Sequence, residues 1–114
     1  MKVIWALSAK LARVAIVQYL IDEFGRKSAI KFNKELKNVV AQIKNYPRSG
    51  QEEKFLAQRD EEYRSIPVGL YNKIVYRVLE KEIHVDDIWD TRREPKKQAD
   101  NTGVDDVEIA LTFK

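Results

Sequence analysis

The sequence contains no cysteine, which excludes disulfides, thiol catalysis and cysteine-ligated metal sites and fits a reducing cytoplasm. It contains one histidine, His84, and a single histidine without clustered ligands makes a poor metal site. No apolar run approaches the roughly 20 residues that cross a bilayer, and the apolar patch after Lys2 is too short for a secretory signal. We therefore expect a cytoplasmic protein with no cofactor, no metal and no membrane partner.

The composition indicates one globular domain. The chain has 114 residues, of which 44% are apolar and 34% are charged, which is ordinary for a soluble protein. Residues 1–97 carry 20 basic and 14 acidic side chains, whereas residues 98–114 carry one basic and four acidic side chains. A basic body favours an anionic partner such as nucleic acid or an acidic protein segment, although a solvated charged surface gives the same counts.

The N-terminal part of the chain predicts a strand followed by two helices. The β-branched and aromatic run at 2–6 predicts the strand. Apolar residues at helical spacing predict a helix over 8–24, capped by Ser8, and a second helix over 28–46, capped by Ser28. Because the connection is short and both helices carry apolar stripes, we expect an αα-hairpin that packs on a sheet.

The segment 62–95 predicts a meander of three antiparallel strands. Runs rich in β-branched and aromatic residues cover 63–68, 71–79 and 83–89, and turn residues separate them. The polar segment 51–61, which precedes the meander, predicts a loop or one helical turn. The chain as a whole therefore predicts an α+β fold with a mainly antiparallel sheet of about four strands.

Several cations of the meander are the candidate site residues. Residues two apart on a strand share a face, so Lys73 and Arg77 lie on one side of the second strand. We expect the meander to bring these two, Arg64 and the pair Arg92 and Arg93 to one small cationic surface. The alternative is that the arginines pair with carboxylates of neighbouring strands: Glu62, Glu80 or Asp90.

Four other residues of the meander invite a functional interpretation. We expect His84 to pack or to form a hydrogen bond across strands. Strict alternation places Asp86 and Asp87 on opposite faces, which argues against a metal site. Tyr71 is a candidate for contact with a target, for example by stacking on a nucleic-acid base.

The acidic tail, 98–114, begins within a polar, disordered-looking stretch that covers residues 96–103. Apolar residues then alternate with others over 106–113, which is typical of a strand with one apolar face: Val107, Ile109, Leu111 and Phe113. A terminal strand must pair with something, because a lone strand is unstable. The candidates are the sheet's own edge, a second subunit and a partner protein, and a homodimer through the helices is also open.

The chain contains four distinctive segments in a defined order. These are KVIW at the start, YPRSGQEE after the second predicted helix, EYRSIPVGLYNKIVYRV in the meander and IWDTRREP at its close. In this order and spacing, the segments resemble the RelE/ParE superfamily of bacterial type II toxin–antitoxin toxins, which includes plasmid stabilisation proteins. The resemblance covers about residues 1–97, predicted as the toxin domain, and leaves the tail 98–114 outside it.

The resemblance implies a small basic toxin that a cognate antitoxin neutralises by wrapping around it. RelE-like members cut messenger RNA on the ribosome, whereas ParE-like members poison DNA gyrase without known catalysis. By local alignment, Arg64, Lys73 and Arg92 or Arg93 correspond to the catalytic cations of RelE-like members. The lysine expected near Ile66 is missing, and no tyrosine follows Arg93.

These departures favour a ParE-like inhibitor of DNA gyrase and leave enzymatic activity open. One alternative is a ribosome-dependent mRNA endonuclease, and another is a repurposed member that keeps only antitoxin binding. In the endonuclease, the catalytic residues would be Arg64, Lys73, Arg92 and Arg93. For either target, gyrase or the ribosome with its mRNA, the binding candidates are Arg64, Tyr71, Lys73, Arg77, Arg92 and Arg93.

Overall fold

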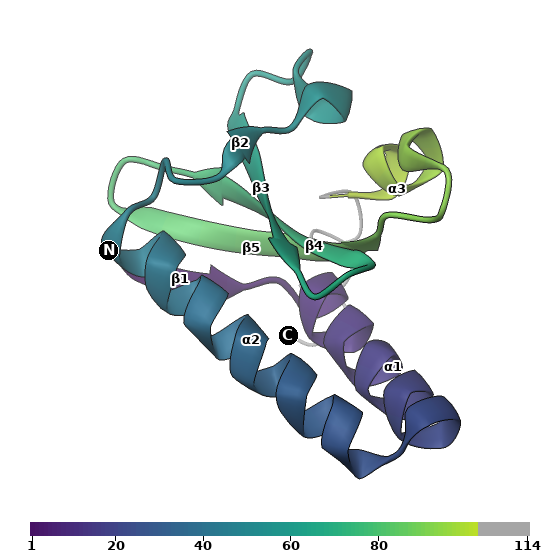
Figure 1. Cartoon of the computed structure of the whole chain (residues 1–114). Helices are drawn as coiled ribbons and strands as arrows, with labels where there is room; N and C mark the ends of the chain where they lie inside the picture. The colour runs from purple at the N-terminus through teal and green to yellow at the C-terminus, as the bar shows by residue number, and fades with distance from the viewer. Residues whose placement is uncertain (103–114) are drawn as a thin grey trace, which may run out of the picture.

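Five strands form one mixed sheet in the computed structural model, which describes residues 1–102. In chain order, the elements are β1 (Lys2–Trp5), α1 (Leu7–Phe24), α2 (Arg26–Asn45), β2 (Gln51–Glu52), the 3-10 turn η1 (Lys54–Leu56), β3 (Glu62–Val68), β4 (Asn72–Val78), β5 (Glu82–Asp90) and α3 (Pro95–Asn101). The spatial order of the strands is β1-β5-β4-β3-β2. Figure 1 shows the α1–α2 hairpin along one face of the sheet and α3 on the opposite side.

The predicted α+β architecture and the meander are confirmed. β3, β4 and β5 pair in antiparallel fashion, and none of their bounds differs from the predicted one by more than one residue. β1 joins the sheet at its edge and runs parallel to β5. The sheet has five strands rather than about four, because β2 adds two residues to the edge at β3.

Both predicted helix caps are wrong. α1 begins at Leu7 without a side-chain cap, and the hydroxyl of Ser8 instead donates to the backbone carbonyl of Asp86 over 2.7 Å. α2 begins at Arg26, two residues before Ser28. The reason is Gly25, whose φ of 92° turns the chain in one residue, so that no polar connection between the helices is needed.

The main core lies between the hairpin and the sheet. α2 buries the predicted stripe, which includes Phe32, Leu36 and Ile43. α1 packs on α2 and on β5, as expected for an αα-hairpin that packs on a sheet. Five large apolar residues on α1 are nevertheless exposed: Leu11, Val14, Tyr19, Ile21 and Phe24. This core holds the sheet against the hairpin and leaves the opposite face of the sheet for other contacts.

A second, smaller cluster covers that opposite face, and it contains Leu56, Tyr63, Val75, Trp89 and Ala99. α3 closes this cluster, although its polar sequence predicted disorder. Pro95 stands in its first turn, where a missing N–H costs nothing. Thr102 is the C-cap of the helix, and its hydroxyl accepts a hydrogen bond from the indole N–H of Trp89 over 2.9 Å.

Two predictions about the ends of the domain bear on α3 and the tail. The predicted boundary at residue 97 falls inside α3. The predicted strand over 106–113 lies outside the described residues.

In the described range 1–102, no helix is both long enough and apolar enough to cross a membrane.

Candidate functional site

The predicted cations lie on both faces of the sheet. Arg64 stands opposite Tyr76, whose ring belongs to the core under the hairpin. Lys73 stands opposite Trp89, which belongs to the cluster on the other face. Because directly paired residues share a side of the sheet, Arg64 and Lys73 point to opposite surfaces. The expectation of one shared cationic surface is therefore wrong.

Each of these two cations is bound to a carboxylate. The Arg64 guanidinium lies 2.6 Å from Glu62 on its own strand and donates to the Gly50 carbonyl over 2.8 Å. The Lys73 ammonium lies 2.6 Å from the buried carboxylate of Glu53. Both charges are thus neutralised within the fold.

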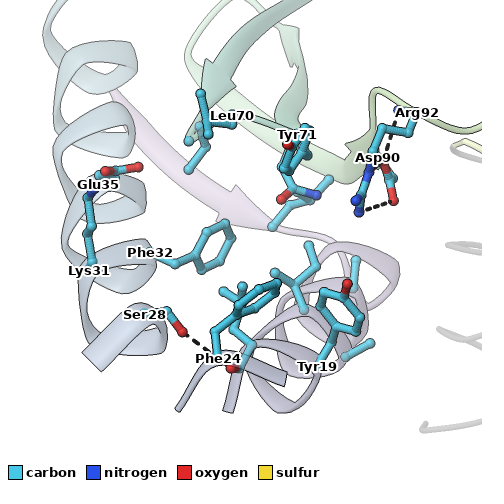
Figure 2. A pocket seen from close by; sticks show the side chains of 18 of the residues that line it. Tyr19, Phe24, Ser28, Lys31, Phe32, Glu35, Leu70, Tyr71, Asp90 and Arg92 are labelled. Atoms are coloured by element: carbon cyan, nitrogen blue, oxygen red, sulfur yellow. Dashed lines mark hydrogen bonds and ion pairs between the residues drawn. The ribbon is translucent and has the colours of Figure 1, made fainter. Parts of the chain in front are cut away.

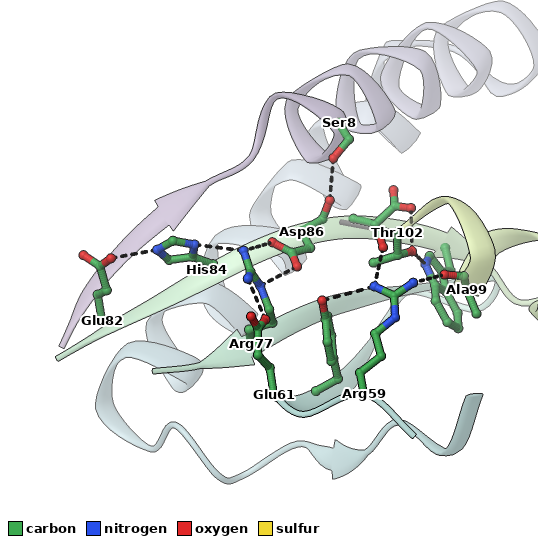
Figure 3. Close-up of polar contacts among 12 residues, drawn as sticks. Ser8, Arg59, Glu61, Arg77, Glu82, His84, Asp86, Ala99 and Thr102 are labelled. Carbon is green, nitrogen blue, oxygen red and sulfur yellow. Dashed lines mark hydrogen bonds and ion pairs between the residues drawn. The ribbon is translucent and has the colours of Figure 1, made fainter. Parts of the chain in front are cut away.

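Arg77 forms the centre of a polar network on the face of the sheet opposite the hairpin, which we call the second face (Figure 3). Its guanidinium lies 2.6 Å from Glu61 and 2.7 Å from the fully buried Asp86. Burial acts to lower the pKa of Arg77, but the bond to Glu61 and the charge of Asp86 outweigh it, and the pKa is raised. His84 lies between Arg77, at 3.1 Å, and Glu82, at 2.8 Å, which confirms its hydrogen-bonding interpretation.

Arg92 and Arg93 are the most exposed of the predicted cations. They follow the end of β5, and Arg93 is 77% exposed. Arg92 bonds to Asp90 over 3.1 Å and stacks 4.3 Å from the ring centre of Tyr71. The side-chain hydrogen bond from Arg92 lowers the pKa of Asp90. These three residues, Tyr71, Arg92 and Arg93, are the predicted site residues that the structure does bring together.

Beside this group lies a cleft of about 750 Å³ that the sequence did not indicate. We call it the hairpin cleft, because α1 and α2 form one wall while the β3–β4 turn and the end of β5 form the other. Figure 2 shows Tyr19, Phe24 and Phe32 on the hairpin side and Leu70 and Tyr71 on the turn side. Leu70 is 87% exposed and Phe24 is 66% exposed. A leucine at the tip of a turn, where polar residues are the rule, is the signal that was available.

The cations of the sheet and the hairpin cleft are suited to different partners. The cations of the sheet have carboxylate partners, so they are poorly suited to stabilise an added phosphate charge. The hairpin cleft combines apolar walls with the cations Lys31, Arg92 and Arg93 and the carboxylates Glu35 and Asp90. Such a surface suits a protein segment that carries apolar and acidic side chains. In the described part of the chain, no three histidine or carboxylate side chains gather as a metal site would require.

Asp87 has an unusual ionisation on the second face. Burial raises the pKa of its carboxyl to about 6, although hydrogen bonds from the Ile88 backbone and the Thr102 hydroxyl oppose the shift. An unfolded aspartate titrates near a pKa of about 3.9. The folded state therefore holds the Asp87 proton more tightly, and this stabilisation is lost as the pH rises through about 6.

We expect Asp87→Asn to gain stability relative to the wild type as the pH rises from about 4 to about 7. In the wild type, a partly buried carboxylate becomes charged over this range, at a cost of about 1–2 kcal/mol after allowance for solvent screening. Urea unfolding of both proteins at several pH values measures the difference. Glu62 and Asp90, whose pKa values are lowered, contribute the opposite slope equally to both proteins. A pH-independent difference would contradict the prediction.

The sequence matches a known protein family, and the fold matches a solved structure. Residues 3–95 match the family described as "ParE toxin of type II toxin-antitoxin system, parDE". A solved structure titled "Chromosomal ParDE TA system from P. aeruginosa" superposes with a TM-score of 0.64 at 19% identity, over 79% of this chain and 95% of that chain. At this identity the likeness supports the fold. No curated protein matches the sequence.

Proposed function

The chain belongs to the ParE toxin family of type II toxin–antitoxin systems, and from this premise we propose that it inhibits DNA gyrase rather than cleaving mRNA. Membership makes it the toxin of a parDE pair, whose partner is a cognate ParD antitoxin. We place its action in the bacterial cytoplasm, where gyrase works. The toxin is a binder in this proposal, and its antitoxin prevents it from reaching the target.

The ion pairs between the sheet cations and carboxylates of the same chain carry this proposal. Cleavage of RNA through its 2′-hydroxyl requires groups that take a proton, stabilise a phosphorane and protonate the leaving oxygen. Arg64 and Lys73, which align with RelE-like catalytic cations, lie on opposite faces, and each is bound to a carboxylate. Arg92 and Arg93 are left as exposed candidates for contact with the target. This arrangement supports binding over catalysis.

Expression of the toxin in bacteria, without its antitoxin, separates the two activities. A gyrase inhibitor is expected to change the supercoiling of a reporter plasmid before the rate of translation falls. A ribosome-dependent nuclease would stop translation first and leave supercoiling unchanged. The second result would overturn the proposal.

A charge-neutral pair of substitutions sharpens the test. Lys73→Met with Glu53→Gln removes both charges of one ion pair and leaves no unpaired buried charge. We expect growth arrest and the supercoiling change to stay within about twofold of the wild type, whereas loss of a catalytic base costs about 100-fold or more. A thermal melt of the purified variant controls for folding. Loss of growth arrest in a folded variant would favour the endonuclease.

A further inference from the structure

Several exposed, large apolar side chains gather in the hairpin cleft. Tyr19, Phe24, Leu70 and Tyr71 are all among the exposed large side chains, and all four line the same cleft. Contiguous apolar surface of this kind usually marks an interaction site. The side chains come from both walls, so a segment lying between the walls would cover them together (Figure 2).

The described chain ends close to this cleft. Gln98 of α3 lines the cleft, and its side chain bonds to the backbone of Asp90 in both directions, over 2.9 and 3.0 Å. Thr102 follows four residues later, one turn along the chain, and is buried. Arg59 donates to the carbonyls of Thr102 and Ala99 and so anchors this end of α3. The remaining chain therefore starts from an anchored position on the face of the sheet opposite the hairpin, one helical turn beyond a residue that lines the cleft.

Residues 103–114, which follow Thr102, have the composition that the cleft would bind. Twelve residues reach at most about 40 Å when extended, which matches the longest dimension of the molecule, 40 Å. The segment is therefore long enough to reach the cleft from Thr102. The segment carries three acidic residues and one lysine, against three cations and two carboxylates in the cleft lining. Large apolar residues alternate along its second half: Val107, Ile109, Leu111 and Phe113.

We propose that residues 103–114 of this same chain bind in the hairpin cleft. The alternating apolar side chains cover Tyr19, Phe24 and Leu70, and the acidic residues lie towards Arg92 and Arg93. The tail then occupies the cleft, and any partner that binds there must displace the tail. This inference concerns the chain alone and does not depend on the target of the toxin.

Paramagnetic labelling of the full chain tests the proposal. Because the chain has no cysteine, Thr112→Cys supplies one attachment site for a nitroxide, on the face opposite the apolar residues. We expect the methyl signals of Ala12, Ala15 and Leu20, which line the cleft, to lose most of their intensity. The methyl signal of Ala57, which follows η1, should keep its intensity. Full intensity at the cleft methyls would overturn the proposal.

Two variants of the tail, each carrying the same nitroxide, provide matched controls. Ile109→Ser combined with Leu111→Ser and Phe113→Ser should restore the cleft signals, whereas Ala110→Ser, on the other face of the segment, should leave them broadened. Broadening that survives the triple substitution would overturn the apolar docking. A mixture of nitroxide-labelled and isotope-labelled chains detects binding between copies. In this mixture the isotope-labelled chains carry no nitroxide, so broadening of their cleft signals would show that the tail binds another copy and would overturn the proposal.

Discussion

Replacing Asp86 by alanine is expected to lower the free energy of unfolding by about 3–5 kcal/mol, because the change leaves a cation without its buried partner. Asp86 is fully buried, and its carboxylate lies 2.7 Å from the guanidinium of Arg77. Arg77 itself is largely buried. The other carboxylate on it, Glu61, is 46% exposed and therefore screened by water.

Urea unfolding measures this effect, and two variants test its cause. Glu61→Ala removes the exposed partner and should cost less than about 1 kcal/mol. Arg77→Met combined with Asp86→Leu removes both charges and should recover most of the loss, since an apolar replacement for a buried ion pair is often neutral. If Asp86→Ala costs no more than Glu61→Ala, the buried pair is not what stabilises this face.

Gly50→Ala is expected to destabilise the fold by about 2–4 kcal/mol, although it adds only a methyl group. A Cβ at this position would lie 2.6 Å from the Tyr76 hydroxyl, 2.8 Å from the Ser65 carbonyl and 2.9 Å from Ile66. The Gly50 N–H donates to Tyr76 over 3.1 Å, and its carbonyl accepts from Arg64. The chain must move away from the sheet, which lengthens both bonds.

A double-mutant cycle with Tyr76→Phe identifies the contact responsible. The phenylalanine ring keeps the packing of Tyr76 but removes the hydroxyl that the new Cβ would meet. Gly50→Ala should therefore cost at least about 1 kcal/mol less in this background than in the wild type. Chemical denaturation of the four proteins supplies the cycle. Additive effects would show that the clash lies with the backbone of Ser65 instead.

The helices and the meander were predictable because their signals are local. Apolar spacing along α2 and β-branched runs in β4 report burial directly, and those segments fold as expected. The sides on which the cations lie depend on register, which is not local. Arg64 faces the hairpin because it pairs with Tyr76 rather than with a neighbour one residue away.

A bulge explains a second error of the same kind. Strict alternation placed Asp86 and Asp87 on opposite faces. In the structure Val75 pairs with Asp87 while Tyr76 pairs with Val85, so Asp86 is an extra residue in β5. Both carboxylates consequently lie on the second face, where Asp86 meets Arg77 and Asp87 meets Thr102. No residue in this stretch is of a type that predicts a bulge.

α3 escaped prediction because so little of it is apolar. Ala99 and Thr102 dock it against Trp89, Gln98 bonds to the backbone of Asp90, and Arg59, about 40 residues earlier in the chain, binds the carbonyls at its end. Long-range contacts of this sort leave no periodic pattern. The hairpin cleft escaped for a similar reason: Leu70 in a turn is unusual, but only the fold places it in one cleft with Phe24.

The parallel pairing of β1 with β5 has a consequence for how the toxin is made. Val3 pairs with Ile83, which follows about 80 residues later, so the sheet cannot be completed until nearly the whole domain has been synthesised. Contacts between such distant residues form late, because closing a long loop costs entropy before the contact stabilises it. On the ribosome, β1 and the α1–α2 hairpin therefore emerge well before the strand that pairs with β1, and the sheet of the described residues is completed only after β5 has been synthesised.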